Sequence, residues 1–258
     1  MRTMTTDEGA PVSSPGPRNR PPVRAEDLQI AGMQPMSGVD WPGKLVATLF
    51  LQGCPWVCPY CHNHAILDPR LPGMVGWEEV EDLLARRHGL LDGVVFSGGE
   101  ATRQVALGDA MERVHDLGYL VGLHTAGPYP HRLEELLAAG LVDWVGIDVK
   151  ALPGDYAEVA GRQGAGWKAW ESLRRVAAHP EVDHEVRVTV YPGGPVDAVG
   201  IALAVRDMGI RRIALQQARA QGAPEGFRAD GIGWEDQVRA MARDIGAMGF
   251  EEFTFRPA

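Results

Sequence analysis

The sequence predicts an α/β fold in which helices alternate with the strands of a parallel sheet. From Leu28 onward, short apolar runs alternate with amphipathic segments, which is typical of repeated strand–helix units. Polar or glycine-rich groups follow most of the apolar runs, and parallel α/β folds carry their chemistry at the carboxyl ends of the strands. The chain has 258 residues, 45% of them hydrophobic, so we expect one sizeable core and one folded domain over residues 28–258.

The first half of this alternation predicts three helices, each preceded by an apolar run. The run 45–51 leads into a cysteine-rich loop, after which Val80, Leu83 and Leu84 recur at the spacing of a helix face. Gly140 follows the third helix and is a typical helix stop. The strands expected in this half are 45–51, 93–96 and 119–125, and the helices are 77–87, 104–117 and 132–139.

The second half repeats the pattern. One apolar run ends on Asp148 and Lys150, and another is stopped by Pro192, Gly193 and Gly194. The strands expected here are 142–149, 185–191, 212–217 and 250–255, and the helices are 167–178, 196–208 and 234–248. The whole chain therefore predicts about six strand–helix units with flanking strands, and no second domain.

Residues 1–27 differ from the rest of the chain in composition. They carry five prolines and the acidic residues Asp7 and Glu8, and they have no apolar stretch. We therefore expect a disordered, proline-rich tail rather than a signal peptide. No run in the chain approaches the roughly 18 to 20 apolar residues that a membrane helix needs, so no membrane partner is expected.

The net charge of the chain narrows the classes of partner that it is expected to bind. The net charge is −9, and an acidic chain is a poor candidate for binding nucleic acid through its phosphates. The simplest interpretation of this charge is solubility. Because there is no export signal and the cysteine thiols have to stay reduced, we expect a cytoplasmic protein.

All three cysteines of the chain lie within eight residues, as Cys54, Cys58 and Cys61. Three clustered thiols in the spacing C-x3-C-x2-C indicate a metal site rather than a disulfide framework. One alternative is a zinc knuckle in which His62 or His64 supplies a fourth ligand. Three buried, unreactive cysteines are a second alternative, although the neighbouring prolines make it a poor one.

The sequence Ser97-Gly98-Gly99-Glu100 follows the strand expected at 93–96. A glycine pair at a strand end lets the backbone approach a ligand closely, because no Cβ intervenes. The exposed backbone groups could bind the ends of an amino acid, and Glu100 adds an acceptor for an ammonium group. Such a pair alone only marks a turn. After a strand and downstream of the cysteine loop, it indicates a ligand site that a zinc knuckle would not need.

Charged residues alternate along two later strands. Asp148 and Lys150 share one face of their strand, and Glu185, Arg187 and Thr189 share one face of theirs. These side chains could form interior ion pairs, in particular between Arg187 and either Asp148 or Glu185. Alternatively, they line a pocket for a zwitterionic ligand, with Asp148 accepting from ribose hydroxyls and Lys150 pairing with a carboxylate.

Polar groups thus follow six separate strands, and the carboxyl ends of parallel strands meet at one edge of a sheet. We expect these groups to converge on a single mouth. They are the cysteine loop, Gly98 to Glu100, His124-Thr125, Asp148 to Lys150, Thr189 to Gly194, and Gln216-Gln217.

Most of the chain, from about residue 28 to residue 256, resembles the radical S-adenosylmethionine (SAM) enzymes that activate glycyl-radical proteins. It is most similar to the family of anaerobic ribonucleoside-triphosphate reductase activating proteins. The cysteine spacing together with Gly98-Gly99-Glu100 is very specific to the superfamily, and the other segments point to the branch. The segments that carry the resemblance are 37–44, 50–54, 58–63, 96–104, 148–150, 185–190 and 215–217.

The resemblance implies a partial, open parallel βα barrel of about six units that holds two cofactors. Cys54, Cys58 and Cys61 would ligate three irons of one 4Fe–4S cluster and leave the fourth iron open, whereas such clusters usually have four cysteine ligands. Tyr60 would lie near the adenine of SAM. The remaining cofactor-binding residues expected are Asn63, Gly98, Gly99 and Glu100 for the amino group, Thr125, Asp148 for the ribose, Lys150 for the carboxylate, Arg187, Thr189 and Gln216.

The resemblance also implies the reaction. The reduced cluster would cleave SAM to a 5′-deoxyadenosyl radical, which would take a hydrogen from a glycine of a partner enzyme, most simply an anaerobic ribonucleotide reductase. A reduced flavodoxin or ferredoxin-type protein would donate the electron. The alternatives are activation of another glycyl-radical enzyme of the pyruvate formate-lyase type, a radical enzyme that modifies a peptide or small molecule, and a zinc-stabilised α/β binding module without activity. His124 stands where relatives often carry an aspartate that helps to hold a monovalent cation.

Overall fold

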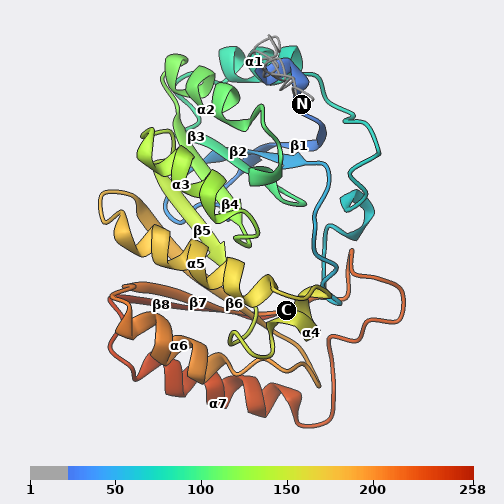
Figure 1. Ribbon diagram of the computed structural model, residues 1–258, viewed down its shortest axis with the longest axis vertical. Helices are drawn as coiled ribbons and strands as arrows, with labels where there is room; N and C mark the ends of the chain where they lie inside the picture. Colours follow the sequence, from blue (N-terminus) through green and yellow to red (C-terminus); the bar gives the residue numbers. More distant parts are fainter. Residues whose placement is uncertain (1–22) are drawn as a thin grey trace, which may run out of the picture.

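One sheet of eight strands organises the protein, as the computed structural model shows for residues 23–258 (Figure 1). The strands lie side by side in chain order, from β1 at one edge to β8 at the other. Their bounds are β1 Ile30–Ser37, β2 Val46–Leu51, β3 Gly93–Gly98, β4 Leu120–Thr125, β5 Trp144–Asp148, β6 Asp183–Val190, β7 Arg212–Gln217 and β8 Glu252–Arg256.

The strands from β2 to β8 are all parallel, and β1 pairs antiparallel with β2. In the part of the chain that the structure describes, β1 and β8 do not pair with each other. The sheet therefore forms an open barrel, which confirms the predicted fold class. Because consecutive strands are parallel neighbours, their carboxyl ends all lie at one end of the barrel, where chemistry is expected.

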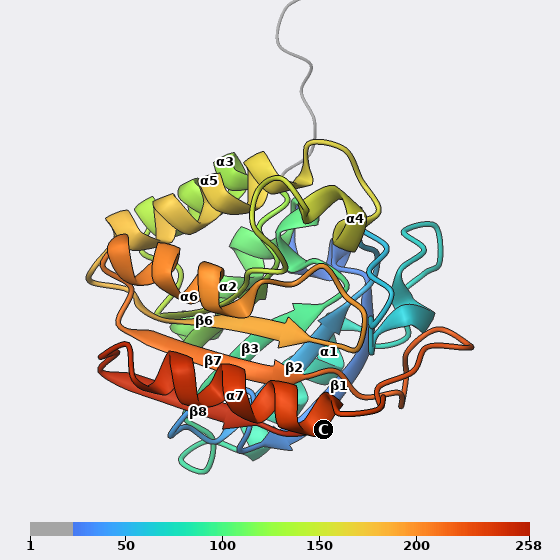
Figure 2. The ribbon, with the colours of Figure 1, turned by 90° about the horizontal axis from the view of Figure 1, so that it is seen from below.

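Helices connect the parallel strands and cover one face of the sheet. In the view of Figure 2, α5 and α6 lie over β6, and α7 lies along β8. The helix bounds are α1 Trp77–Arg86, α2 Leu107–Asp116, α3 Pro130–Ala138, α4 Tyr156–Ala160, α5 Ala165–Ala178, α6 Ala198–Asp207 and α7 Trp234–Gly246, with short 3-10 turns η1 Ala25–Asp27, η2 His64–Ile66 and η3 Ala101–Arg103.

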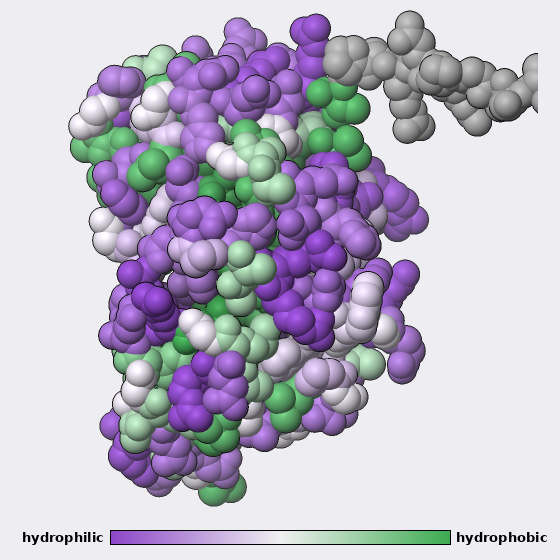
Figure 3. Space-filling model, turned by 60° about the vertical axis from the view of Figure 1, so that its left-hand side comes forward, coloured by the Kyte–Doolittle hydropathy of each residue, from purple (hydrophilic) through white to green (hydrophobic). Residues whose placement is uncertain are grey.

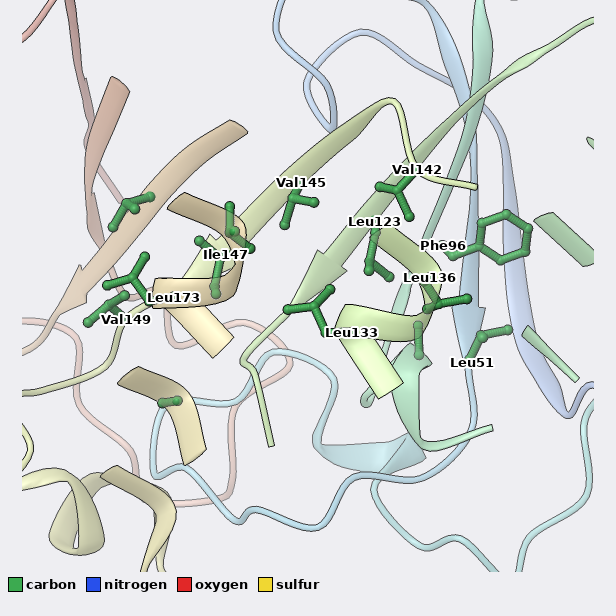
Figure 4. Close-up of a cluster of buried hydrophobic side chains, with 14 of the residues drawn as sticks. Leu51, Phe96, Leu123, Leu133, Leu136, Val142, Val145, Ile147, Val149 and Leu173 are labelled. Atoms are coloured by element: carbon green, nitrogen blue, oxygen red, sulfur yellow. The ribbon is translucent and has the colours of Figure 1, made fainter. Parts of the chain in front are cut away.

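The alternation of residues along each strand decides what each face of the sheet can do. Leu51, Phe96, Leu123 and Ile147 point outward and pack against the helices, where they meet residues such as Leu133 (Figure 4). These side chains are completely buried and form the main core. Their neighbours along the strands face the inside of the barrel, so the polar side chains gather there.

The inside of the barrel is filled partly by a loop of the chain itself. The loop between β1 and β2 places Trp41 against Trp144 of β5, with ring centroids 5.4 Å apart and nearly parallel planes. Gly122 allows this contact, because a Cβ there would lie 2.8 Å from the Trp41 ring. With Val46 and Val95 these rings form a second, smaller apolar cluster. This cluster fills the barrel interior on the side opposite the helices.

The structure adds elements that the sequence pattern did not predict. Strand β1 and the short helix α4 were not expected, and most of the other helix and strand ends differ by a few residues. Ala25–Asp27 forms η1, in which the Ala25 amide donates to Asp109 of α2, so these three residues of the expected tail are packed on the folded domain. The rest of the expected tail, residues 1–22, lies outside the described residues.

The surface shows no broad apolar area in the view of Figure 3, where hydrophilic residues predominate and hydrophobic ones form small, separate groups. Among residues 23–258, no helix is both long and apolar enough to cross a membrane.

Candidate active site

The three cysteines lie on the loop that follows β2, and all three line one cavity of about 250 Å³ at the carboxyl end of the barrel. The backbone holds this loop in place from both sides. The Gly53 amide donates to Ile66 and the Cys54 amide to Leu67, while the Cys61 amide donates to the Cys58 carbonyl across a tight turn. The loop thus brings the three cysteines, which are close in sequence, to the same cavity.

Burial controls the protonation of these thiols. Desolvation raises the pKa of Cys54 to about 12, and it also raises the pKa values of Cys58 and Cys61, although the charge of Lys150 opposes the shift. Without a metal the three thiols therefore stay protonated at neutral pH. Thiolate is the form that binds metal, so loading the site must release protons.

The glycine turn after β3 is locked onto the cysteine loop by backbone contacts. The Gly99 amide donates to Leu51 and the Glu100 amide donates to Gly53, both at 2.9 Å. Gly98 has a φ of +110°, and a Cβ on Gly99 would lie 2.5 Å from the Gly53 carbonyl oxygen. Only glycine fits these two positions. The close approach aligns Gly98 and Gly99 beside the cysteines, and both line the cavity.

Glu100 does not line this cavity, unlike the other predicted cofactor-binding residues. Its carboxylate is buried and accepts hydrogen bonds from the Thr102 backbone and hydroxyl, the Thr125 hydroxyl at 2.7 Å and the Ala126 amide at 3.0 Å. Burial raises the pKa of Glu100, while these four donors stabilise the charged form. Glu100 therefore ties the glycine turn to the end of β4.

Asp148 and Lys150 form the ion pair that their shared strand face allows. The Lys150 ammonium lies 3.2 Å from the Asp148 carboxylate and 5.5 Å from the centre of the Tyr60 ring. Burial alone would lower the pKa of Lys150, but the negative charge of Asp148 is the main cause that raises it well above its ordinary value. Lys150 is thus a permanent cation at the cavity wall, next to the cysteines.

Arg187 makes the interior ion pair that the sequence left open, and its partner is Glu185 rather than Asp148. The guanidinium donates to Glu185 at 2.9 Å, to the His124 ring at 3.0 Å and to the Asp40 carbonyl at 3.1 Å. It also lies over the Trp144 ring. Arg187 therefore holds the loop between β1 and β2 inside the barrel and presents one face to the cavity.

Arg256 completes this wall and was missed by the sequence analysis. It donates to Glu185 and to Gln216, both at 2.8 Å, and Gln216 donates to Thr189 at 3.3 Å. The strand register pairs Arg256 with Gln216, so the alternation along β8 could have identified it. His124 and Gln217, which were expected at the mouth of the barrel, line the cavity as well. The lining residues that were not among the expected cofactor-binding residues are Trp56, His62, Ser97, Ala126, Arg219 and Pro257.

The zinc alternative finds no support in the position of His62. Its Nδ1 lies 2.9 Å from the Gln221 carbonyl, and its Nε2 lies 3.5 Å from the Arg219 amide. Both ring nitrogens therefore face the loop after β7. Within residues 23–258, no three Cys, His, Asp or Glu side chains are grouped closely enough to hold one metal ion.

One buried polar atom of the cavity has no partner in the protein. The Tyr60 hydroxyl is buried and makes no hydrogen bond within the described residues, although its ring packs against Tyr191 with centroids 5.0 Å apart. Three soft thiol ligands, a cation–carboxylate pair and an unpaired hydroxyl share this cavity. This donor set fits a thiolate-bound iron–sulfur cluster next to a small zwitterionic cofactor.

Comparison with known sequences identifies the family. The Radical SAM superfamily pattern matches residues 48–213, which include the cysteine loop, the glycine turn and the cavity-lining residues of β3 to β6, but not those of β7 and β8. The chain belongs to the radical SAM superfamily. Members of this superfamily use a 4Fe–4S cluster and SAM, so these are the cofactors of the protein and it is a radical SAM enzyme.

Individual relatives agree with this membership. The chain is 30% identical over 224 residues to a protein of Methanocaldococcus jannaschii named putative glycyl-radical enzyme activating enzyme, covering 83% of this chain and 90% of that one. It is 32% identical over 177 residues to the pyruvate formate-lyase-activating enzyme of Clostridium pasteurianum, covering 64% and 69%. The structure of QueE from Escherichia coli shares the fold at 17% identity, with a TM-score of 0.50 over 89% of this chain and 93% of that one.

Proposed function

We propose that this radical SAM enzyme generates a glycyl radical on a partner enzyme. The observation that carries the proposal is the similarity to a glycyl-radical enzyme activating enzyme over most of both chains. A second relative, which activates pyruvate formate-lyase by its name, supports the same class of reaction. The partner would be a folded enzyme, and its glycine would have to reach the cavity at the carboxyl end of the open barrel.

The cavity supports a division of roles among its residues. We assign Cys54, Cys58 and Cys61 as the ligands of the cluster, which leaves one iron open for SAM. Lys150 would pair with the carboxylate of SAM, and Asp148, whose side chain is 39% exposed, would accept from its ribose hydroxyls. The backbone at Gly98 and Gly99 would bind the amino group. Further contacts would come from Tyr60, Asn63, Thr125, Arg187, Thr189 and Gln216.

When SAM is bound and the cluster is reduced, the two cofactors together supply a radical that removes a hydrogen atom. The task of the protein is to position SAM and to exclude water. Tyr60, Tyr191 and Phe227 pack in a row beside the cavity, with neighbouring ring centroids 5.0 and 5.9 Å apart. Glu100 holds the glycine turn against the end of β4, as described above. These contacts would hold SAM in one geometry, and hydrogen abstraction requires reacting atoms roughly 3 to 3.5 Å apart.

We further propose that the partner is an anaerobic ribonucleotide reductase. This proposal is based on the resemblance of the segments around Asp40, the cysteine loop and Gln216 to activating proteins of that enzyme. A partner of the pyruvate formate-lyase type is the competing candidate, because the clostridial relative has that substrate by name. The electron would come from a reduced flavodoxin or ferredoxin-type protein.

The deciding experiment is anaerobic reconstitution with iron and sulfide, followed by reduction in the presence of SAM and each candidate partner. We expect four irons per chain, formation of 5′-deoxyadenosine, and the electron paramagnetic resonance doublet of a glycyl radical on the ribonucleotide reductase. The doublet on pyruvate formate-lyase alone would reassign the partner. Cleavage of SAM without a doublet on either enzyme would favour a radical enzyme that modifies a peptide or small molecule.

The variant Cys58→Ala is the control for the metal centre. Two thiolates cannot keep the cluster, so the variant should be colourless and should form no 5′-deoxyadenosine. A brown variant with unchanged iron content would remove Cys58 from the ligand set. A wild-type protein that binds one zinc ion per chain and never becomes coloured would contradict the enzyme function altogether.

A further inference from the structure

Two exposed arginines border the cysteine loop outside the cofactor cavity. The Arg103 guanidinium lies 3.3 Å from the position that a Cβ on Gly53 would occupy, directly before Cys54. Arg162 follows Gly161, where a Cβ would lie 3.2 Å from the Val57 carbonyl oxygen. The Arg103 guanidinium therefore lies at the beginning of the loop, and the backbone next to Arg162 adjoins its middle. Neither of them lines the cofactor cavity.

A half-buried tyrosine, Tyr129, belongs to the same region. Burial raises the pKa of Tyr129, the positive charges of Arg103 and Arg162 lower it, and the negative charge of Glu100 raises it. Tyr129 also lines an open hollow of the surface together with Arg103 and Val105. Arg103, Arg162 and Tyr129 thus belong to one surface region around Cys54, on the outer side of the cysteine loop.

The same region exposes apolar side chains. Val57, within the cysteine loop, is 60% exposed, and Val105, in the hollow, is 64% exposed. Protein interfaces combine such apolar contacts with a charged border. Asp27 adds one carboxylate to the lining of the hollow. The region therefore has the composition of a small docking surface: two cations, two valines and a tyrosine.

The two arginines make no ion pair within the part of the chain that the structure describes. Neither Arg103 nor Arg162 forms an ion pair with any residue from 23 to 258, whereas Arg113 and Arg187 each pair with carboxylates. The chain as a whole carries a net charge of −9. Arg239 and Arg243 on α7 are likewise exposed and form no ion pair among residues 23–258, so nearness to the cysteine loop is what distinguishes Arg103 and Arg162. Cations there would attract an acidic partner to the part of the surface next to Cys54.

We propose that Arg103 and Arg162, with Val57, Val105 and Tyr129, form the docking surface for an acidic electron-transfer protein that reduces the cluster. The inference rests on the proposed function, because that function requires a cluster at Cys54. One electron would leave the donor's reduced cofactor and enter the cluster, so the donor is oxidised and the cluster reduced by one electron. No proton or covalent bond is exchanged. The substrate glycine would need the cavity itself, so this outer surface remains available to a donor.

The test compares two reductants with the reconstituted, full-length protein. The variant R103E/R162E reverses both charges, and R239E/R243E is the control, since Arg239 and Arg243 are exposed on α7, beside the far edge strand β8 (Figure 2). Formation of 5′-deoxyadenosine is measured with a reduced, acidic flavodoxin and, separately, with saturating dithionite. We expect R103E/R162E to lose at least tenfold in the flavodoxin-driven rate and to change less than twofold with dithionite.

The salt dependence and a direct binding measurement complete the test. The flavodoxin-driven rate of the wild type and of the control should fall as salt is raised from 20 to about 200 mM, because screening weakens attraction between exposed charges. The variant should lack this dependence and should bind flavodoxin at least tenfold more weakly. The neutral variant R103Q/R162Q should lie between the two.

Three results would overturn the proposal. The flavodoxin-driven rate of R103E/R162E could match that of the control. Its dithionite-driven rate could fall equally, which would make the arginines structural. Finally, R103E/R162E could keep its flavodoxin-driven rate of 5′-deoxyadenosine formation but fail to activate the partner enzyme with dithionite. This result would assign the surface to the substrate protein. A wild type that cleaves no SAM with dithionite would instead disprove the proposed function itself.

Discussion

Lys150 is a cation of the cavity wall that contacts Asp148 and lies over the ring of Tyr60. If it pairs with the carboxylate of SAM, Lys150→Ala should weaken SAM binding by about 1.5 to 3 kcal/mol, the usual contribution of a hydrogen bond to a charged group. Anaerobic equilibrium dialysis with the reconstituted protein measures this. Lys168→Ala, at an exposed position of α5, is the control and should bind normally. An unchanged affinity in Lys150→Ala would exclude Lys150 from the SAM site.

His124 makes stability depend on pH. Burial and the charge of Arg187 lower its pKa well below the ordinary value, so the folded protein keeps the ring neutral. The unfolded chain takes up a proton below about pH 6.5. The unfolded state then binds more protons than the folded state, so the free energy of unfolding falls as the pH decreases.

The expected difference between variants is measurable by urea unfolding at pH 5, 6 and 7. Below pH 6, the free energy of unfolding of the wild type should fall as the pH decreases, and His124 should account for up to about 1.4 kcal/mol of this fall per pH unit. The variant His124→Gln should lack this contribution. His131→Gln, at an exposed position, should leave the slope as it is in the wild type. Equal slopes in all three proteins would show that His124 takes up its proton in the folded state.

At the scale of elements, the loop between β1 and β2 acts as part of the core. Trp41 stacks on Trp144 and is 5% exposed, whereas Trp167 on α5 is 60% exposed. Trp41→Ala should therefore lower the free energy of unfolding by about 3 to 5 kcal/mol. Trp167→Ala should change it by less than about 0.5 kcal/mol. Urea unfolding followed by circular dichroism provides the comparison, and similar values for both variants would mean that the loop does not support the barrel.

The elements that the sequence predicted well share a clear pattern. Helices such as α1 and α7 carry apolar residues on one face, and strands such as β3 are short apolar runs that end in glycine. Strand β1 was missed because it contains Gly32 and Pro35 and has only two buried residues. Proline is tolerated there because β1 is an edge strand, and its place is decided by pairing with β2. Local sequence does not contain that information.

The whole molecule is an open barrel whose cofactor cavity is built from most of its strands, so ligand binding should stabilise the entire fold. A ligand that binds only the folded state adds about 2.7 kcal/mol at 100 times its dissociation constant. We expect SAM to raise the free energy of unfolding of the reconstituted protein by this amount. Cys58→Ala, which should lack the cluster, should gain much less. Equal stabilisation of both proteins would mean that SAM binds without the cluster.

The sequence by itself determined the cysteine cluster and most of the residues that line the cavity. Cysteine spacing, the glycine pair and the alternation along the strands are local properties, and every predicted site residue except Glu100 lines the cavity. Only the tertiary structure decided the hydrogen-bond partners. It turned Glu100 toward Thr102, Thr125 and Ala126, joined Arg187 to Glu185 rather than Asp148, and brought Arg256 into the wall. The physical reason is that alternation fixes the face on which a side chain lies, whereas its partner depends on register and packing between strands distant in sequence.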